Sequence, residues 1–246
     1  MTYPYPVSRL LNLGDPRGQT GWPVYRTLGL TAEHVPDLIR MVTDEELNGA
    51  SSDSREVWAP LHAWRALGQL GAESAIGPLL TLLHRIDDNG DDSVGEELPR
   101  VFGLIGPAAI PALATYLADP LHKLFARVAA AHGLGRIGQR HRAARGECVA
   151  ALTRQLERFA ETEPTLNGFV ISYLLELEAV ESAPQIERAF AAGRVDLSIA
   201  GDWEDVQVRL GLKRTRESPR PRLFDPGLLM GARAQTSGRK KRKKRK

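Results

Sequence analysis

The pentapeptide Leu67-Gly68-Gln69-Leu70-Gly71 recurs twice further along the chain, and this recurrence predicts a repeat fold. The later copies are Phe102-Gly103-Leu104-Ile105-Gly106 and Leu134-Gly135-Arg136-Ile137-Gly138. Each copy ends one apolar segment of helical period and precedes a second one, which is the pattern of two helices joined by a short turn. Units of this kind stack on one another, because one helical pair cannot bury its apolar face alone.

The glycines of the pentapeptide have two expected uses. The last one, as at Gly71 and Gly106, can adopt the left-handed conformation that ends a helix. The earlier one, as at Gly68, leaves room for a partner helix to approach closely. No segment alternates between apolar and polar residues over the length of a strand, so the sequence predicts an all-α fold.

Two weaker copies flank the three clear ones. Leu28-Gly29-Leu30 is followed by a helical pattern over 35–42, and 174–190 keeps the apolar positions without the glycines. Terminal repeats diverge in this way because one of their faces meets water. The sequence predicts an α-solenoid of about five helical hairpins over 23–212, closed by a short helix with Asp202 as its N-cap. A lead-in at 1–22 precedes it and a disordered basic tail at 213–246 follows.

The pattern Leu-Gly-x-Leu-Gly-x-x-x-Ala-Ile-x-x-Leu at 67–79 is echoed with one residue fewer at 102–113. It resembles the HEAT-like repeats of the phycobiliprotein-lyase type, and the resemblance implies a solenoid of HEAT-like hairpins. Such solenoids serve as scaffolds, adaptors, chromophore lyases and nucleic-acid binders, so the resemblance implies little about activity. Some bacterial proteins with similar repeats end in a cysteine-rich zinc module, which this chain cannot form because its one cysteine is Cys148.

Charge is distributed unevenly along the chain. It has 33 basic and 30 acidic side chains in 246 residues, but 14 of the basic and 2 of the acidic ones lie in 213–246. A body of net charge −9 therefore precedes a tail of net charge +12. A single cysteine and the lack of a long apolar stretch predict a cytoplasmic protein with no membrane span. A hydrophobic content of 42% excludes a wholly disordered chain.

The tail ends in a run of basic residues. Each lysine or arginine that replaces a counterion on a polyphosphate gains release entropy, so the run predicts salt-dependent contact with RNA or another polyanion. The alternative is a solvated tail that keeps an acidic body soluble or folds back on it. The residues of the run are Arg239, Lys240, Lys241, Arg242, Lys243, Lys244, Arg245 and Lys246.

A second candidate site is a stripe of arginines on the second helices of the units. When the repeats are aligned, Arg40, Arg154 and Arg188 occupy one repeat position, and Arg85 and Arg158 lie four residues further on. The second helices of a solenoid are expected to form its concave wall, so we expect these arginines to face a protein partner or an anionic ligand. An ordinary solvated surface with local ion pairs is the alternative.

Catalytic and metal-binding patterns are absent from the sequence. The histidines are scattered, with no pair at ligand spacing, and no nucleophile elbow or phosphate-binding loop occurs. His62 shares a helix face with Trp58 and Arg65, where we expect Trp58 to pack and the other two to be solvated. The acidic segment 87–97 lacks the glycine and glutamate positions of a calcium loop, so it predicts an acidic surface insertion. Cys148 aligns with small residues in the sister repeats, which favours a buried spacer.

These observations predict a binding scaffold or adaptor that is not an enzyme and needs no cofactor or metal. Its concave face would bind a protein partner, and its tail would contact nucleic acid or another polyanion. One alternative is a lyase or chaperone of the phycobiliprotein-lyase type, which the family resemblance implies. Another is a nucleic-acid-binding protein, although the acidic body opposes DNA lying along the solenoid.

Overall fold

The computed structural model describes residues 2–16 and 21–220, and the regular elements in them are all helices. No strand occurs in these ranges, which confirms the predicted all-α class. Within them no single helix is long and apolar enough to cross a membrane, while Asp92–Ile105 and Pro107–Ala118 pass that test together as a pair bent by 117°. The basic run 239–246 lies outside the described residues.

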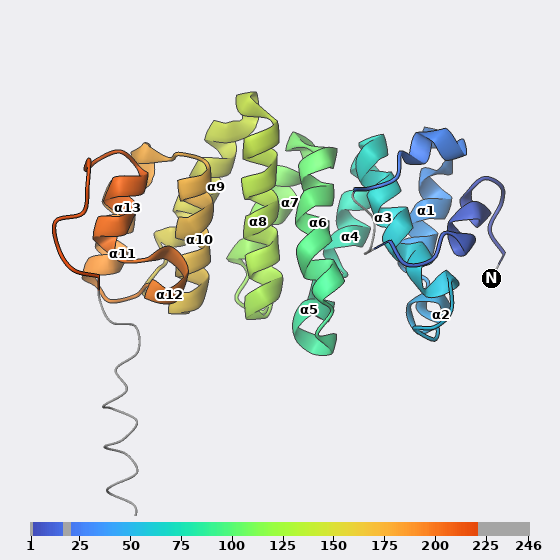
Figure 1. The fold of residues 1–246 in the computed structure, drawn as a ribbon, viewed down its shortest axis with the longest axis horizontal. Helices are drawn as coiled ribbons and strands as arrows, with labels where there is room; N and C mark the ends of the chain where they lie inside the picture. The colour runs from blue at the N-terminus through green and yellow to red at the C-terminus, as the bar shows by residue number, and fades with distance from the viewer. Residues whose placement is uncertain (1, 17–20, 221–246) are drawn as a thin grey trace, which may run out of the picture.

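The main helices form two layers along the long axis of the molecule (Figure 1). The first layer consists of α3 (Ala59–Leu70), α6 (Asp92–Ile105), α8 (Leu124–Arg140) and α10 (Pro164–Glu176). The second layer consists of α4 (Ile76–Leu80), α7 (Ile110–Ala118), α9 (Arg145–Leu156) and α11 (Ala183–Ala191). Helices of each layer pack against their neighbours in chain order. The three pentapeptides all lie at the C-terminal ends of first-layer helices.

Shorter elements close the two ends of the layers. At the N-terminal end, the 3-10 helices η1 (Val7–Asn12) and η2 (Tyr25–Leu28) pack on α3, as does α1 (Val35–Val42). At the other end, α12 (Leu197–Ala200) packs on α10, and α13 (Trp203–Arg209) packs on α11. The remaining short elements are η3 (Ala32–His34), α2 (Glu45–Asn48), η4 (Glu56–Trp58), η5 (Glu73–Ala75), α5 (His84–Asn89), η6 (Pro107–Ala109), η7 (Arg142–Ala144) and η8 (Val180–Ser182).

The N-terminal lead-in and the closing helix both belong to the packed body. Val7 and Leu10 in the lead-in are fully buried, so the boundary predicted at residue 22 does not separate a loose segment from the core. At the other end, the Asp202 side chain accepts the N–H of Asp205 and caps α13, as predicted. The ring centroid of Trp203 lies 6.1 Å from that of Phe190 on α11.

Two glycines explain why the pentapeptide recurs. Gly71 ends α3 in the left-handed conformation with φ of 65°, as predicted. A Cβ atom at Gly103 would lie 2.9 Å from Cβ of Arg136, so the missing side chain lets α6 and α8 pack closely. The left-handed cap predicted at Gly106 is wrong: φ is 97°, but ψ of −155° lies outside the left-handed helical region.

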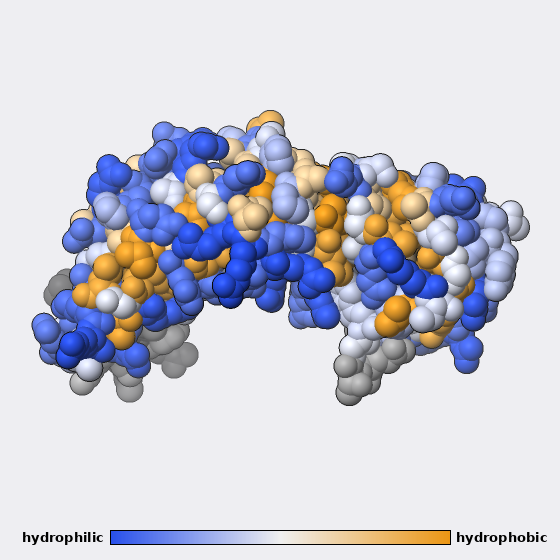
Figure 2. Space-filling model, turned by 90° about the horizontal axis from the view of Figure 1, so that it is seen from above, coloured by the Kyte–Doolittle hydropathy of each residue, from blue (hydrophilic) through white to orange (hydrophobic). Residues whose placement is uncertain are grey.

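The molecule is curved, and Figure 2 shows one hollowed side. The hollow lies on the side that faces the viewer in Figure 1, where the first-layer helices are in front. The expectation that the second helices form the concave wall is therefore wrong. The glycines at 68, 103 and 135 lie where successive first-layer helices meet, and their missing side chains bring those helices together. Closer spacing in one layer bends the stack towards that layer.

A substitution at Leu79 tests the packing between the two layers. Its side chain on α4 is fully buried. We expect Leu79→Ala to lower the free energy of unfolding by about 2–5 kcal/mol, because the truncation loses apolar contacts and leaves a cavity. Urea unfolding followed by circular dichroism measures this change. Thr81→Ala, at an exposed position two residues further on, serves as the control and should change stability by less than about 0.5 kcal/mol.

Candidate functional site in the hollow

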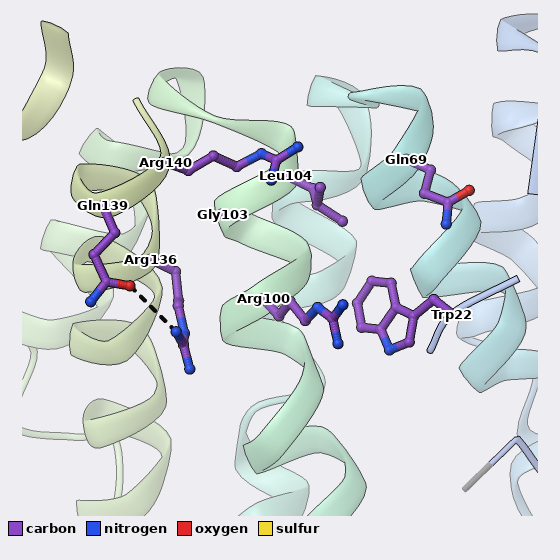
Figure 3. Close-up of a pocket in the computed structure, with 8 residues that line it drawn as sticks. All are labelled: Trp22, Gln69, Arg100, Gly103, Leu104, Arg136, Gln139 and Arg140. Atoms are coloured by element: carbon purple, nitrogen blue, oxygen red, sulfur yellow. Dashed lines mark hydrogen bonds between the residues drawn. The ribbon is translucent and has the colours of Figure 1, made fainter. Parts of the chain in front are cut away.

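The hollow side contains a pocket of about 650 Å³ between three first-layer helices. Figure 3 shows guanidinium and amide groups around it, with one indole ring at its edge. The residues that line it are Trp22, Gln69, Arg100, Gly103, Leu104, Arg136, Gln139 and Arg140. The polar lining is therefore formed by three arginines and two glutamines, with no carboxylate among these residues.

The third residue of each pentapeptide faces this pocket. Gln69 on α3, Leu104 on α6 and Arg136 on α8 occupy that repeat position and all line the pocket. Gln69 and Leu104 are the next-to-last residues of α3 and α6, whereas Arg136 lies one turn before Gln139, the next-to-last residue of α8, and so faces the same side. The third residues of the pentapeptides were therefore a sequence signal for this pocket. An alignment of the second helices alone does not include these residues.

The three arginines that line the pocket can bind an anionic ligand through their positive charges. Arg100, Arg136 and Arg140 are exposed, and none forms an ion pair within 2–16 or 21–220. Arg136 donates to the Oε1 atom of Gln139 over 3.3 Å, and the Arg100 guanidinium lies 4.2 Å from the centroid of the Trp22 ring. A local excess of positive charge therefore lies in the hollow of a body that is acidic overall.

A buried ion pair joins α3 to α6 next to Trp22, at the edge of the pocket. Arg65 on α3 donates from Nε to Oε2 of Glu97 over 2.6 Å, and its Nη2 pairs with the other carboxylate oxygen. Trp64 Nε1 also donates to Glu97 over 3.1 Å. The Arg65 guanidinium lies 4.9 Å from the centroid of the Trp22 ring, so two guanidinium groups contact that indole.

The expectation that His62 and Arg65 are solvated is wrong. His62 is fully buried and Arg65 is 4% exposed. The cause is the N-terminal chain, which covers this face of α3: the Tyr25 hydroxyl and the Gly14 carbonyl both hydrogen-bond the His62 ring. Burial lowers the pKa of His62, so the imidazole is neutral at pH 7.

None of the five arginines of the predicted stripe lines the pocket. Arg40 pairs with Asp37 over 3.0 Å and lies 4.6 Å from the centroid of the Tyr3 ring. Arg85 pairs with Asp91 over 2.7 Å. The other three, on α9, just after it and on α11, belong to the outer layer: Arg154, Arg158 and Arg188.

The outer arginines also differ in their contacts. Arg158 pairs with Glu161 over 3.3 Å and donates to the Ala118 carbonyl over 2.8 Å. Arg188 donates to Gln185. Arg154 is exposed and forms no ion pair within the described ranges, which makes it a suitable control for the pocket arginines.

The acidic segment 87–97, which begins inside α5, stabilises its neighbours. Asp87 accepts the N–H groups of Phe125 and Ala126 over 3.1 and 2.8 Å, at the positive N-terminal end of α8. Asp88 pairs with Lys123 over 2.5 Å. The segment is therefore more than an acidic surface insertion, and in the described residues no cluster of three or more metal-ligating side chains occurs.

Cys148 is a buried spacer, as predicted. It is fully buried. The alignment with Ala75 and Ala109 is off by one turn, because these alanines end the 3-10 helices η5 and η6, and the residue that ends η7 is Ala144. Burial raises the pKa of the Cys148 thiol to about 11, which keeps it protonated and weakly nucleophilic at pH 7.

The first part of the predicted tail is packed on α13. Arg216 pairs with Asp205 over 3.0 Å and also with Asp202, while Lys213 pairs with Glu204 over 3.0 Å. The carboxylates of α13 thus hold the chain as far as residue 220, so the domain boundary predicted at 212 lies too early. The rest of the predicted tail, 221–246, has ten basic residues and one acidic residue and lies outside the described residues.

Comparisons of the chain with protein-family models, curated proteins and solved structures found no match.

Proposed function

We propose that the protein is a binding scaffold, an α-solenoid of HEAT-like hairpins whose hollow face holds an acidic segment of a protein partner. One observation carries the proposal: three exposed arginines without ion-pair partners in the described chain line one pocket on the concave side. The packed layers hold their helices in place, so a partner meets a preformed charged surface.

The chemistry of the pocket suits carboxylates. Guanidinium groups bind carboxylates through charge-assisted, bidentate hydrogen bonds, and Arg140 is available for such a contact. Leu104 and the indole of Trp22 add apolar surface next to these charges. An acidic segment with an apolar side chain among its carboxylates matches this lining.

Two observations favour a protein segment over single-stranded nucleic acid. Base stacking needs a free aromatic face, and the indole in this pocket already contacts the guanidinium groups of Arg65 and Arg100. Residues 1–212 have a net charge of −9, which opposes a long polyanion along the body. The basic residues of 221–246 would add electrostatic contact to an acidic partner or to a polyanion.

Binding of a fluorescein-labelled polyaspartate decapeptide tests the proposal. The protein used is the full-length chain with glutamine at the basic positions of 239–246, so that the tail does not bind the probe. We expect saturable anisotropy changes at low salt, and Arg140→Ala should weaken binding about tenfold, the effect of losing one charged contact of about 1.4 kcal/mol.

Arg154→Ala is the matched control, because this exposed arginine lies on the outer layer. It should change the affinity by less than about twofold. Equal weakening by Arg140→Ala and Arg154→Ala would contradict a site in the hollow. Tighter binding of a single-stranded oligonucleotide than of the peptide, lost on Arg140→Ala, would instead favour the nucleic-acid alternative.

A further inference from the structure

His62 connects α3 to two separate parts of the N-terminal chain. The Tyr25 hydroxyl lies 2.6 Å from Nδ1, and the Gly14 carbonyl lies 2.9 Å from Nε2. A carbonyl only accepts, so Nε2 has the proton and donates, and Nδ1 accepts from the Tyr25 hydroxyl. The contact with Tyr25 uses the neutral ring, whereas the bond to Gly14 is kept when the ring is protonated. The side chain is fully buried, so bulk water does not reach it.

The same chain segment forms one edge of the hollow pocket. We call residues 21–25 the N-terminal wall, because Trp22 within it lines the pocket beside Gln69 and Arg100 (Figure 3). Gln69 holds this wall by accepting the N–H of Tyr25 over 2.9 Å and donating to the Pro23 carbonyl over 2.7 Å. His62 and Gln69 therefore attach the N-terminal wall to α3.

A proton on His62 would disturb this attachment. Nδ1 would become a donor, so the hydrogen bond from the Tyr25 hydroxyl in its present orientation would be lost. The charged groups that face the ring are Arg65 from α3, Glu97 from α6 and Asp15 from the N-terminal chain. Glu97 is already paired with Arg65, so a buried imidazolium would add a second positive charge beside that guanidinium.

We infer that His62 is a proton-sensitive anchor, and that its protonation releases the N-terminal wall from α3 and removes Trp22 from the edge of the hollow pocket. The effect on partner binding rests on the proposed function, whereas the release of the wall does not. Burial lowers the pKa of His62 below 6.5, its ordinary value, so the protonated ring favours the released state. Attachment is complete above about pH 6.5 and weakens as the pH falls towards the pKa of the folded protein.

Hydrogen exchange of the Tyr25 amide in the full-length protein tests the anchor. This N–H belongs to the wall and donates a hydrogen bond to Gln69 on α3. After correction for the intrinsic exchange rate, we expect protection at pH 5.0 to be up to about 30-fold lower than at pH 7.5, from the proton linkage of one histidine. Amides of α10 should keep their protection. Unchanged protection of Tyr25 at pH 5.0 would overturn the inference.

His62→Gln separates protonation from packing. A glutamine can accept from the Tyr25 hydroxyl and donate to the Gly14 carbonyl without taking up a proton, so this variant should keep Tyr25 protected at pH 5.0. His84→Gln, at an exposed position, should behave like the wild type. Equal acid sensitivity of His62→Gln and the wild type would assign the effect to another group.

Direct titration covers the case in which His62→Gln fails to fold. Ring signals of His62 in nuclear magnetic resonance spectra of the wild type should change over the same pH range as the Tyr25 signals. His132, whose pKa burial lowers to about 4, provides an internal reference for a titration that is independent of the wall. If the two sets of signals change at different pH values, His62 is not the anchor.

The polyaspartate probe distinguishes the two proposals, since aspartates remain ionised at pH 5.0. In the chain with glutamine at the basic positions of 239–246, weaker binding at pH 5.0 that is absent after His62→Gln supports both proposals. Release of the wall without binding of the probe at any pH would contradict the proposed function and leave the anchor standing. Binding of the probe without a His62-dependent change in Tyr25 exchange would contradict the anchor and leave the proposed function standing.

Discussion

Glu97→Gln is expected to lower the free energy of unfolding by about 3–5 kcal/mol, because it leaves a buried charge without its partner. The Arg65 side chain is 4% exposed, and both of its carboxylate contacts go to Glu97. A glutamine has the same shape but offers one acceptor oxygen and no negative charge. The indole N–H of Trp64, which donates to the same carboxylate, loses a charge-assisted bond as well.

Urea unfolding of the wild type and the variant measures this loss. Glu96→Gln is the matched control, because Glu96 is exposed on the same helix and forms no ion pair in the described residues, so its replacement should cost less than about 0.5 kcal/mol. Replacing both partners by methionine should cost much less than Glu97→Gln alone, since no buried charge remains. Equal losses in Glu97→Gln and Glu96→Gln would contradict the role given to the buried pair.

Gly103→Val should destabilise the protein by about 3 kcal/mol, because it forces side-chain atoms into the contact between α6 and α8. The first added atom, Cβ, would already lie 2.9 Å from Cβ of Arg136, and valine adds two methyl groups beyond it. Cβ of Arg136 cannot swing away as the end of a side chain can, so the two helices must separate. We also expect weaker polyaspartate binding, since Arg136 lines the pocket.

Gly146 provides the control for this substitution. It lies exposed in α9, and a Cβ atom there would meet nothing within 4 Å. Gly146→Val should therefore change the stability by less than about 0.5 kcal/mol, the small difference in helix propensity between the two residues. Thermal unfolding of both variants in parallel measures the contrast. Similar stabilities of Gly103→Val and Gly146→Val would show that the close approach of α6 and α8 is unimportant.

The candidate site shows where interpretation of the sequence alone was incomplete. The repeat alignment placed Arg154 and Arg188 at equivalent positions, but Arg154 is the tenth residue of α9 and Arg188 the sixth of α11, so they differ by one helical turn. Periodicity also does not say which layer of a curved stack is concave. The pocket arginines were visible in the sequence, and Arg136 even lies inside a pentapeptide. Their meeting with Trp22 could not be predicted, because the chain between Trp22 and Arg136 is long and contains no local signal for that contact.

By itself the sequence determined the helical class, the paired helices and the cap at Asp202, because periodicity and capping are local properties of neighbouring residues. Contacts between distant segments set the direction of curvature, the burial of His62 and the packing of 213–220 on α13. Each of these depends on segments distant in the chain that meet in space, where close helix spacing, a covering N-terminal segment and ion pairs determine the result.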